Sequence, residues 1–240
     1  TGGVGYNTNL YLFGPSGMSV TTSSGNNQFD FKLTATGTWT VVVEDIGDDT
    51  PGTYSVSFLN MTAGPTSSVA DPDGGPIASN EIKTGSFSDG VDMDVFTFSG
   101  NSGETVLLSA RATGVGSHNT QLNLYPPGGG SAVIVTASDR NEVTLTATGT
   151  WTLVLFDNGL NDPGAYALSF LNINAGPLTS VGDTDGGPLA SAEVRSGTSV
   201  AGDFDAFTFT GTLNDRILFN GIETGGVGYN TNLYLFGPSG

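Results

Sequence analysis

Paired aspartates give this sequence its clearest candidate chemistry. Eight of them fall into two sets of the same pattern: Asp71, Asp73, Asp92 and Asp94, then Asp183, Asp185, Asp203 and Asp205. Asp92 and Asp94 are two residues apart in a strand-like run, so both side chains should point to one face. Two carboxylates side by side repel each other unless a cation or hydrogen-bond donors lie between them.

Calcium is the cation that such a set would suit. It prefers several carboxylate and carbonyl oxygens, and the segment Asp71-Pro72-Asp73-Gly74-Gly75 offers both kinds next to Asp92 and Asp94. The competing interpretation is turn chemistry, because Asp before Gly stabilises turns without any metal. We predict a Ca²⁺ site at each set and keep the metal-free turn as the alternative.

A second acidic cluster has a simpler interpretation. It comprises Glu44, Asp45, Asp48 and Asp49, and its counterpart later in the chain comprises Asp157, Asn158, Asn161 and Asp162. The counterpart carries fewer charges, which argues against a conserved need for a metal. We expect a solvated hairpin loop at both places.

Catalytic side chains are scarce. His118 is the only histidine and has Tyr6 and Tyr229 as counterparts, so a Ser-His-Asp triad is not supported and a surface loop position is expected. The absence of cysteine excludes thiol chemistry and disulfides. We therefore predict that the protein is not an enzyme.

Charge narrows the range of partners. The 23 acidic residues outnumber the 6 Lys and Arg, for a net charge of −17. Nucleic acid is therefore excluded as a partner, because its phosphates would be repelled. No apolar run approaches the length of a membrane span, so no membrane insertion is expected. A cysteine-free, lysine-poor and threonine-rich chain is typical of extracellular or cell-surface proteins.

A repeat organises the whole chain. Residues Thr1–Gly17 return unchanged at Thr224–Gly240, and a diverged copy lies at Thr113–Gly129. The first segment recurs without change after two intervals of unequal length, which predicts a super-repeat built of two unlike domains. We expect the sequence to be a slice of a longer array or polymer.

The segments between these copies have the residue pattern of β-strands. Apolar residues alternate with polar ones, and turns rich in Gly, Pro, Asp and Asn separate the runs. No stretch of ten residues keeps its apolar residues three and four positions apart, as an amphipathic helix would, so we expect no helix. The predicted fold is all-β, with tandem antiparallel β-sandwich domains of jelly-roll type. One sandwich core should combine alternating residues of three strands: Leu122, Leu124, Trp151, Leu153, Leu155, Tyr166, Leu168 and Phe170.

These patterns define five segments. We expect the C-terminal part of a sandwich at 1–62, a linker at 63–80, a complete sandwich at 71–174, a second linker at 175–191 and the N-terminal part of the next sandwich at 183–240. The two partial domains should leave apolar faces exposed, such as Leu10, Leu12 and Phe13, which the tail of one chain would cover on the head of the next.

The order of the motifs resembles the bacterial pre-peptidase C-terminal domain family. The motifs are Asp71–Pro76, Asp92–Gly100, Leu122–Gly129, Thr146–Asp157 and Gly164–Asn172. The resemblance implies a jelly-roll-like sandwich, secretion, and a binding or spacer role beside proteases. It also implies calcium where the linker meets the sheet, as in the related collagen-binding domains of clostridial collagenases.

Two functions are consistent with these features. The first is a structural extracellular protein, a filament or cell-surface stalk of tandem sandwiches with calcium-stiffened linkers. Its partner would be the protein itself, as a head-to-tail polymer or a covalent tandem array. The second is an accessory module of a secreted hydrolase that binds collagen-like or polysaccharide ligands. The unchanged repeat favours the first, because a ligand site does not require identical stretches beside unlike neighbours.

Overall fold

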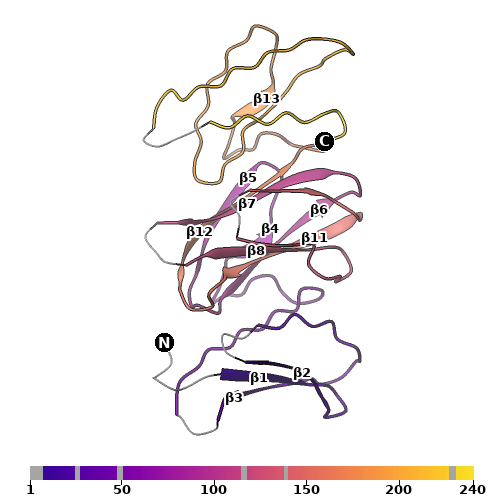
Figure 1. The fold of residues 1–240 in the computed structure, drawn as a ribbon, viewed down its shortest axis with the longest axis vertical. Coiled ribbons are helices and arrows are strands. Elements are labelled where there is room, and N and C mark those ends of the chain that lie inside the picture. The colour runs from indigo at the N-terminus through magenta and orange to yellow at the C-terminus, as the bar shows by residue number, and fades with distance from the viewer. Residues whose placement is uncertain (1–7, 25–27, 48–50, 115–117, 138–139, 227–230) are drawn as a thin grey trace.

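The computed structural model describes residues 8–24, 28–47, 51–114, 118–137, 140–226 and 231–240. Within these ranges the chain is built of strands and contains no helix, which confirms the predicted all-β fold (Figure 1). The strands are β1 Thr8–Phe13, β2 Ser19–Ser24, β3 Thr40–Asp45, β4 Gly74–Pro76, β5 Glu81–Phe87, β6 Met93–Gly100, β7 Thr105–Thr113, β8 Thr120–Tyr125, β9 Ile134–Thr136, β10 Asn141–Thr144, β11 Gly149–Asp157, β12 Gly164–Asn172, β13 Gly186–Pro188 and β14 Ala206–Thr208.

Two sheets form a sandwich in the middle of the chain. The four-stranded sheet has the order β10-β7-β12-β5, and the five-stranded sheet has the order β4-β6-β11-β8-β9. Neighbouring strands are antiparallel except β4, which runs parallel to β6. We call residues 71–174 the central sandwich. Successive side chains of each strand point alternately into the space between the sheets and to the outer face.

The core lies between the two sheets. All eight residues predicted from the alternating pattern are buried, which confirms the assignment of the inward face. Aromatic rings pack on one another within this core: Phe98 of β6 stacks on Phe170 of β12 with ring centroids 4.3 Å apart. The indole nitrogen of Trp151 donates to the Ala147 carbonyl, so the largest buried side chain is also satisfied.

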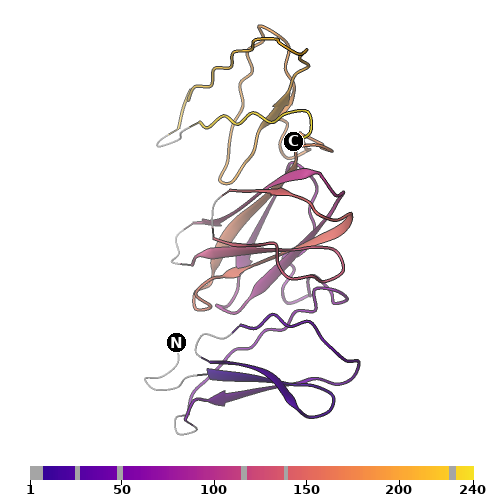
Figure 2. The ribbon, with the colours of Figure 1, turned by 45° about the vertical axis from the view of Figure 1, so that its right-hand side comes forward.

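Smaller sheets flank the central sandwich. Residues 8–60, called the head, contain the sheet β2-β1-β3, and residues 175–240, called the tail, contain the parallel pair β13-β14. Figures 1 and 2 show the head and the tail at opposite ends of the central sandwich, with the three parts in a row. No helix of the described residues is long and apolar enough to cross a bilayer.

Both ends repeat pairings of the central sandwich. Strand β1 pairs β3 in the register of β8 with β11: Leu12 faces Val41 as Leu124 faces Leu153. Strand β13 pairs β14 in the register of β4 with β6: Gly186 faces Ala206 as Gly74 faces Val95.

The expectation that Leu12 belongs to an exposed apolar face is wrong. Its side chain is only 5% exposed, and Leu10 and Phe13 are half-buried. The reason is that β1 is the middle strand of its sheet, with β2 and β3 on its two edges. Other apolar residues of the head are exposed, among them Tyr54, Val56 and Phe58.

Specific contacts join the three parts. At the head, Leu59 and Met61 pack against a cluster of Tyr125, Val154 and Phe156 on the outer face of the five-stranded sheet. At the tail, the Ser79 hydroxyl donates to the Pro177 carbonyl at 2.8 Å, and the Arg140 guanidinium lies 4.0 Å from the centre of the Tyr234 ring. The linkers are therefore fastened to the central sandwich.

Candidate metal centre

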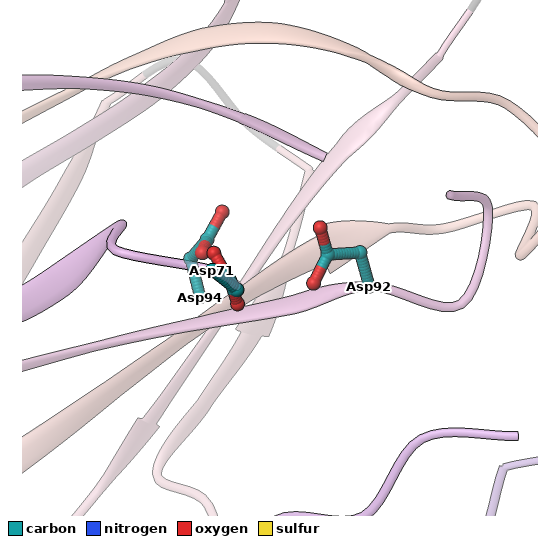
Figure 3. Close-up of side chains that lie close together, drawn as sticks. All are labelled: Asp71, Asp92 and Asp94. Carbon is teal, nitrogen blue, oxygen red and sulfur yellow. The ribbon is translucent and has the colours of Figure 1, made fainter. Parts of the chain in front are cut away.

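Three aspartates converge where the first linker enters the central sandwich. Asp71 precedes β4, while Asp92 and Asp94 lie at the start of β6, which pairs with β4. One carboxylate oxygen from each of the three lies within 4.8 Å of the others, and Figure 3 shows the carboxylates grouped beside the β6 strand. The structure thus brings together three of the four aspartates predicted for this set.

The local backbone explains why Asp71 reaches β6. The Ser68 amide donates to the Asp71 carbonyl at 2.6 Å, and the Asp71 amide donates to the Ser68 hydroxyl at 3.0 Å. Beyond this turn, a Cβ at Gly74 would lie 2.4 Å from the Thr66 carbonyl oxygen and 2.7 Å from that of Val95. Only glycine allows the chain to pass so close to β6, with φ of 133°.

Asp94 is the most unusual member of the group. Its side chain is 0% exposed, and neither carboxylate oxygen has a hydrogen-bond partner among the described residues. Burial raises the pKa of Asp94 to about 8; the nearby Tyr166 hydroxyl lowers it in part, and the charges of Asp71, Asp92 and Asp73 raise it further. A buried carboxylate with no donor is costly in a protein interior unless a positive charge compensates it.

Asp71 and Asp92 complete the arrangement. Burial, followed by the charge of Asp92, raises the pKa of Asp71. One oxygen of Asp92 accepts hydrogen bonds from the Ser88 amide at 2.7 Å and the Ser88 hydroxyl at 2.8 Å, which fixes the direction of this carboxylate. The three side chains therefore present oxygens to one point, and neither Asp94 oxygen accepts a hydrogen bond among the described residues.

Asp73 has a different place in the structure. Its Oδ2 accepts the Ser86 amide of β5 at 2.9 Å, and it is not among the three grouped carboxylates. This contact ties the linker to the edge strand of the four-stranded sheet, and differs from the turn within the linker that the sequence offered as the alternative. Asp73 still lies near enough for its charge to raise the pKa of Asp94.

The second set has a related arrangement in the tail. Asp183, Asp185 and Asp205 bring one oxygen each within 4.8 Å of one another, and Asp203 is outside this group. Asp183 also accepts the side-chain amide of Asn80 in the central sandwich at 2.7 Å. Unlike Asp94, Asp205 is exposed; even so, partial desolvation and the charges of Asp203, Asp183 and Asp185 raise its pKa to about 7.

The other acidic cluster is not simply a solvated loop. Asp48 and Asp49 lie outside the described residues, Glu44 is exposed and Asp45 is buried. Asp157 is also buried, and its carboxylate accepts the amides of Asn119, Asn161 and Asp162 at 2.8–3.2 Å. Burial alone would raise the pKa of Asp157, but these donors hold it below its usual value. The expectation of a solvated loop is wrong for Asp157 because backbone donors surround it.

His118 is buried, which corrects the prediction of a surface position. Its ring meets Phe87 edge to face, with centroids 5.7 Å apart. The counterparts Tyr6 and Tyr229 lie outside the described residues. Because an aromatic ring occupies this place in every copy of the sequence, His118 is best understood as a packing residue.

Sequence reasoning missed two residues of the site. Tyr166 was assigned to the core, yet its hydroxyl lies next to Asp94. Asn80 was not singled out, although it holds Asp183 at the second linker. Tyr54 occupies the position of Tyr166 in the other copy, and this recurrence is a signal for Tyr166. No feature of the sequence points to Asn80.

Two surface hollows of the described residues are small. One of about 220 Å³ is lined by residues that include Ser79, Phe98 and Glu104, and another of about 230 Å³ lies next to His118. Ligand pockets for organic molecules usually enclose roughly 300–1,000 Å³. Neither hollow suits such a ligand.

Comparisons with known proteins give structural neighbours only. No protein-family model and no curated protein matches the chain. Among solved structures, it is similar to PliG, a periplasmic inhibitor of g-type lysozyme from Aeromonas hydrophila, with 20% identity, a TM-score of 0.34, and coverage of 41% of this chain and 96% of that one. It is also similar to the pre-peptidase C-terminal domain of a collagenase from Bacillus anthracis, with 21% identity, a TM-score of 0.33, and coverage of 41% and 94%.

Proposed function

We propose that this protein is a structural extracellular protein whose β-sandwich units are joined end to end into a filament or cell-surface stalk. The observation that carries the proposal is the row of head, central sandwich and tail, in which both ends repeat pairings of the centre. A chain built of similar units in a row extends along one axis, as repeat proteins do.

The linkers support an extended, stiff arrangement. Strand β4 pairs in a sheet of the central sandwich, although its residues fall in the segment 63–80 that the sequence predicted as a linker. At the second linker, Ser79 and Asn80 bind Pro177 and Asp183 by side-chain hydrogen bonds. Units held by such contacts keep their relative orientation better than units on a free Gly- and Ser-rich linker.

Calcium at the junctions is part of the proposal. Asp71, Asp92 and Asp94 would hold one ion where the first linker enters the central sandwich, and Asp183, Asp185 and Asp205 would hold another in the tail. The support is the donor set, which is all oxygen, and the two unpartnered oxygens of buried Asp94. Bound calcium would supply the positive charge that these carboxylates lack, and each site would fasten a linker to the strand it meets.

Electron microscopy of the native material tests the structural role. Antibody raised against the 240-residue chain should label filaments or stalks at regular axial intervals, and pre-immune serum should not. The denatured mass of the labelled material then gives the number of units joined covalently. Label confined to a secreted hydrolase, with no extended particles, would overturn the proposal in favour of an accessory ligand-binding module.

A further inference from the structure

The hollow beside His118 contains polar atoms that packing does not explain. His118 and Thr120 are only 6% and 4% exposed, and both line this hollow of about 230 Å³. Neither ring nitrogen of His118 has a hydrogen-bond partner among the described residues, nor has the Thr120 hydroxyl. Contact with Phe87 accounts for the ring carbons of His118 but leaves its nitrogens unpaired. Buried polar groups without partners are rare in folded proteins, so these atoms call for a partner.

The hollow lies at one end of the central sandwich, where β7 of one sheet ends and β8 of the other begins. Alternation places Thr120 on the same face of β8 as Leu122, a core residue. On β7, Ala110 belongs to the core and Ala112 follows two residues later. The hollow therefore continues the space between the sheets outward, and small alanine side chains leave it open.

The polar side chains around the hollow are hydrogen-bond donors. Arg111 and Asn119 are exposed and line it together with buried His118 and Thr120. A guanidinium, an amide, an imidazole and a hydroxyl can all donate hydrogen bonds, and the guanidinium carries a permanent positive charge. Among the described residues that line the hollow, none has a carboxylate. A lining of donors and positive charge suits an anion.

The His118 ring is held in place from two directions. It meets the ring of Phe87, at the end of β5, edge to face at an interplanar angle of 84°. The backbone of Gly164, at the start of β12, lies against Nδ1, and a Cβ added at Gly164 would collide with this nitrogen. A ring fixed in this way loses little freedom when a ligand binds, which favours affinity.

The donors are a property of this copy of the repeat. Counted back from the start of the repeat motif in each copy, Ile222 stands in the tail in place of Arg111, and Glu223 in place of Ala112. The histidine is replaced by tyrosine, as described above. The tail sequence thus loses the arginine and gains a carboxylate at these positions. The two kinds of unit therefore differ in the residues that would recognise an anion.

We propose that the hollow next to His118 binds a single carboxylate group, as part of a small organic acid. Arg111, His118 and Thr120 would donate hydrogen bonds to its two oxygens. The hollow is below the size range of larger organic ligands, but water occupies only about 30 Å³ per molecule in the liquid, so an acid of a few heavy atoms fits. This binding site goes beyond the proposed structural function and does not depend on it.

The charge of the chain selects among anions. With a net charge of −17, the chain as a whole repels anions, and the repulsion grows in proportion to the charge of the ligand. A singly charged carboxylate therefore meets less repulsion than a doubly charged sulfate of similar size. The specific donors of the hollow have to outweigh only this smaller term.

NMR of the full chain tests the site. Because His118 is the only histidine, its ring signals in a ¹H–¹³C spectrum are identified without further assignment. Sodium acetate is the probe, titrated at neutral pH against sodium chloride so that the ionic strength stays constant. We expect the His118 ring signals to shift and saturate with acetate. Sodium sulfate at equal ionic strength should bind more weakly.

Two variants identify the donors. Arg111→Gln should weaken acetate binding about tenfold or more, as expected for loss of a charge-assisted hydrogen bond. Arg195→Gln is the matched control, because Arg195 pairs with Glu193 in the tail and does not line the hollow, and it should bind acetate normally. Thr120→Val should also weaken binding. Since this hydroxyl has no partner to lose, the melting temperature of the acetate-free Thr120→Val chain should be unchanged or higher.

Several outcomes would overturn the site. One is a shift of the His118 signals that is equally large in chloride alone, or that grows without saturation. Another is normal acetate binding by both Arg111→Gln and Thr120→Val. A lower melting temperature of acetate-free Thr120→Val would mean that the hydroxyl serves the fold and not a ligand. Sulfate binding more tightly than acetate would exclude the assignment to a carboxylate.

Discussion

At the scale of single residues, burial decides which aspartates are candidates for chemistry. Asp73 and Asp94 are both aspartates near the same junction, yet Asp73 accepts a backbone amide and Asp94 accepts nothing among the described residues. A carboxylate that accepts hydrogen bonds needs no metal, whereas a buried and unpartnered one is stabilised either by protonation or by a cation. The proposed ion site therefore depends on Asp94 and not on Asp73.

Removal of calcium should destabilise the chain through Asp94. An ion that binds only the folded state raises the free energy of unfolding by mass action, by about 2.7 kcal/mol when its concentration is a hundred times Kd, and so raises the melting temperature. We expect melting to occur at a higher temperature in calcium than in chelator. Asp94→Asn should lose one of two bound ions per chain and much of this difference, measured by calorimetry and elemental analysis.

The matched control for this prediction is Asp162→Asn, which alters an acidic residue outside both sets. It should bind as much calcium as the unmodified chain. Superimposable melting curves with and without calcium, together with no bound ion, would exclude the metal at this junction.

Asp157 should make the free energy of unfolding depend on pH. Its pKa is lowered in the folded state, because backbone donors outweigh burial, so its ionised form stabilises the fold at pH values above the unfolded pKa of about 3.9. That contribution is lost as the pH falls through the lower, folded pKa. Asp157→Asn should cost about 1–3 kcal/mol near neutral pH, measured by urea unfolding.

The difference between Asp157→Asn and the unmodified chain should shrink in strong acid. Taking the difference cancels the other carboxylates, including Asp162, whose amide donates to Asp157. A gap of the same size at neutral pH and below the folded pKa would mean that the charge of Asp157 contributes nothing.

At the scale of elements, alternation in the sequence predicted most of the fold. The pattern of Leu153 and Leu155 in β11, and of Tyr166 and Leu168 in β12, identifies the buried face because a strand turns successive side chains to opposite sides. Asp71, Asp92 and Asp94 were predicted together because their spacing and turn residues are local features.

Features decided by tertiary contacts could not be predicted in this way. Strand β4 is Gly74–Pro76, which has no alternating pattern and forms only because β6 lies beside it. The environment of Asp157 depends on amides from a distant loop, and the burial of His118 depends on Phe87. From the sequence alone, Asp157 and His118 are both expected in surface loops.

The central sandwich should be sensitive to truncation at Leu153. This residue is fully buried in the middle of β11, so Leu153→Ala should cost about 2–5 kcal/mol by loss of contacts and formation of a cavity. Chemical unfolding followed by fluorescence of Trp151, in a Trp39→Phe background, measures the loss. Val135→Ala on the exposed edge strand β9 is the control and should change stability by less than about 0.5 kcal/mol.

At the scale of the whole molecule, one sequence occurs in two structural states. Residues 8–13 and 231–236 are identical, yet the first form β1 between β2 and β3, while the second form no strand and expose Leu233 and Leu235. Identical residues differ because strand formation depends on neighbours more than on intrinsic preference.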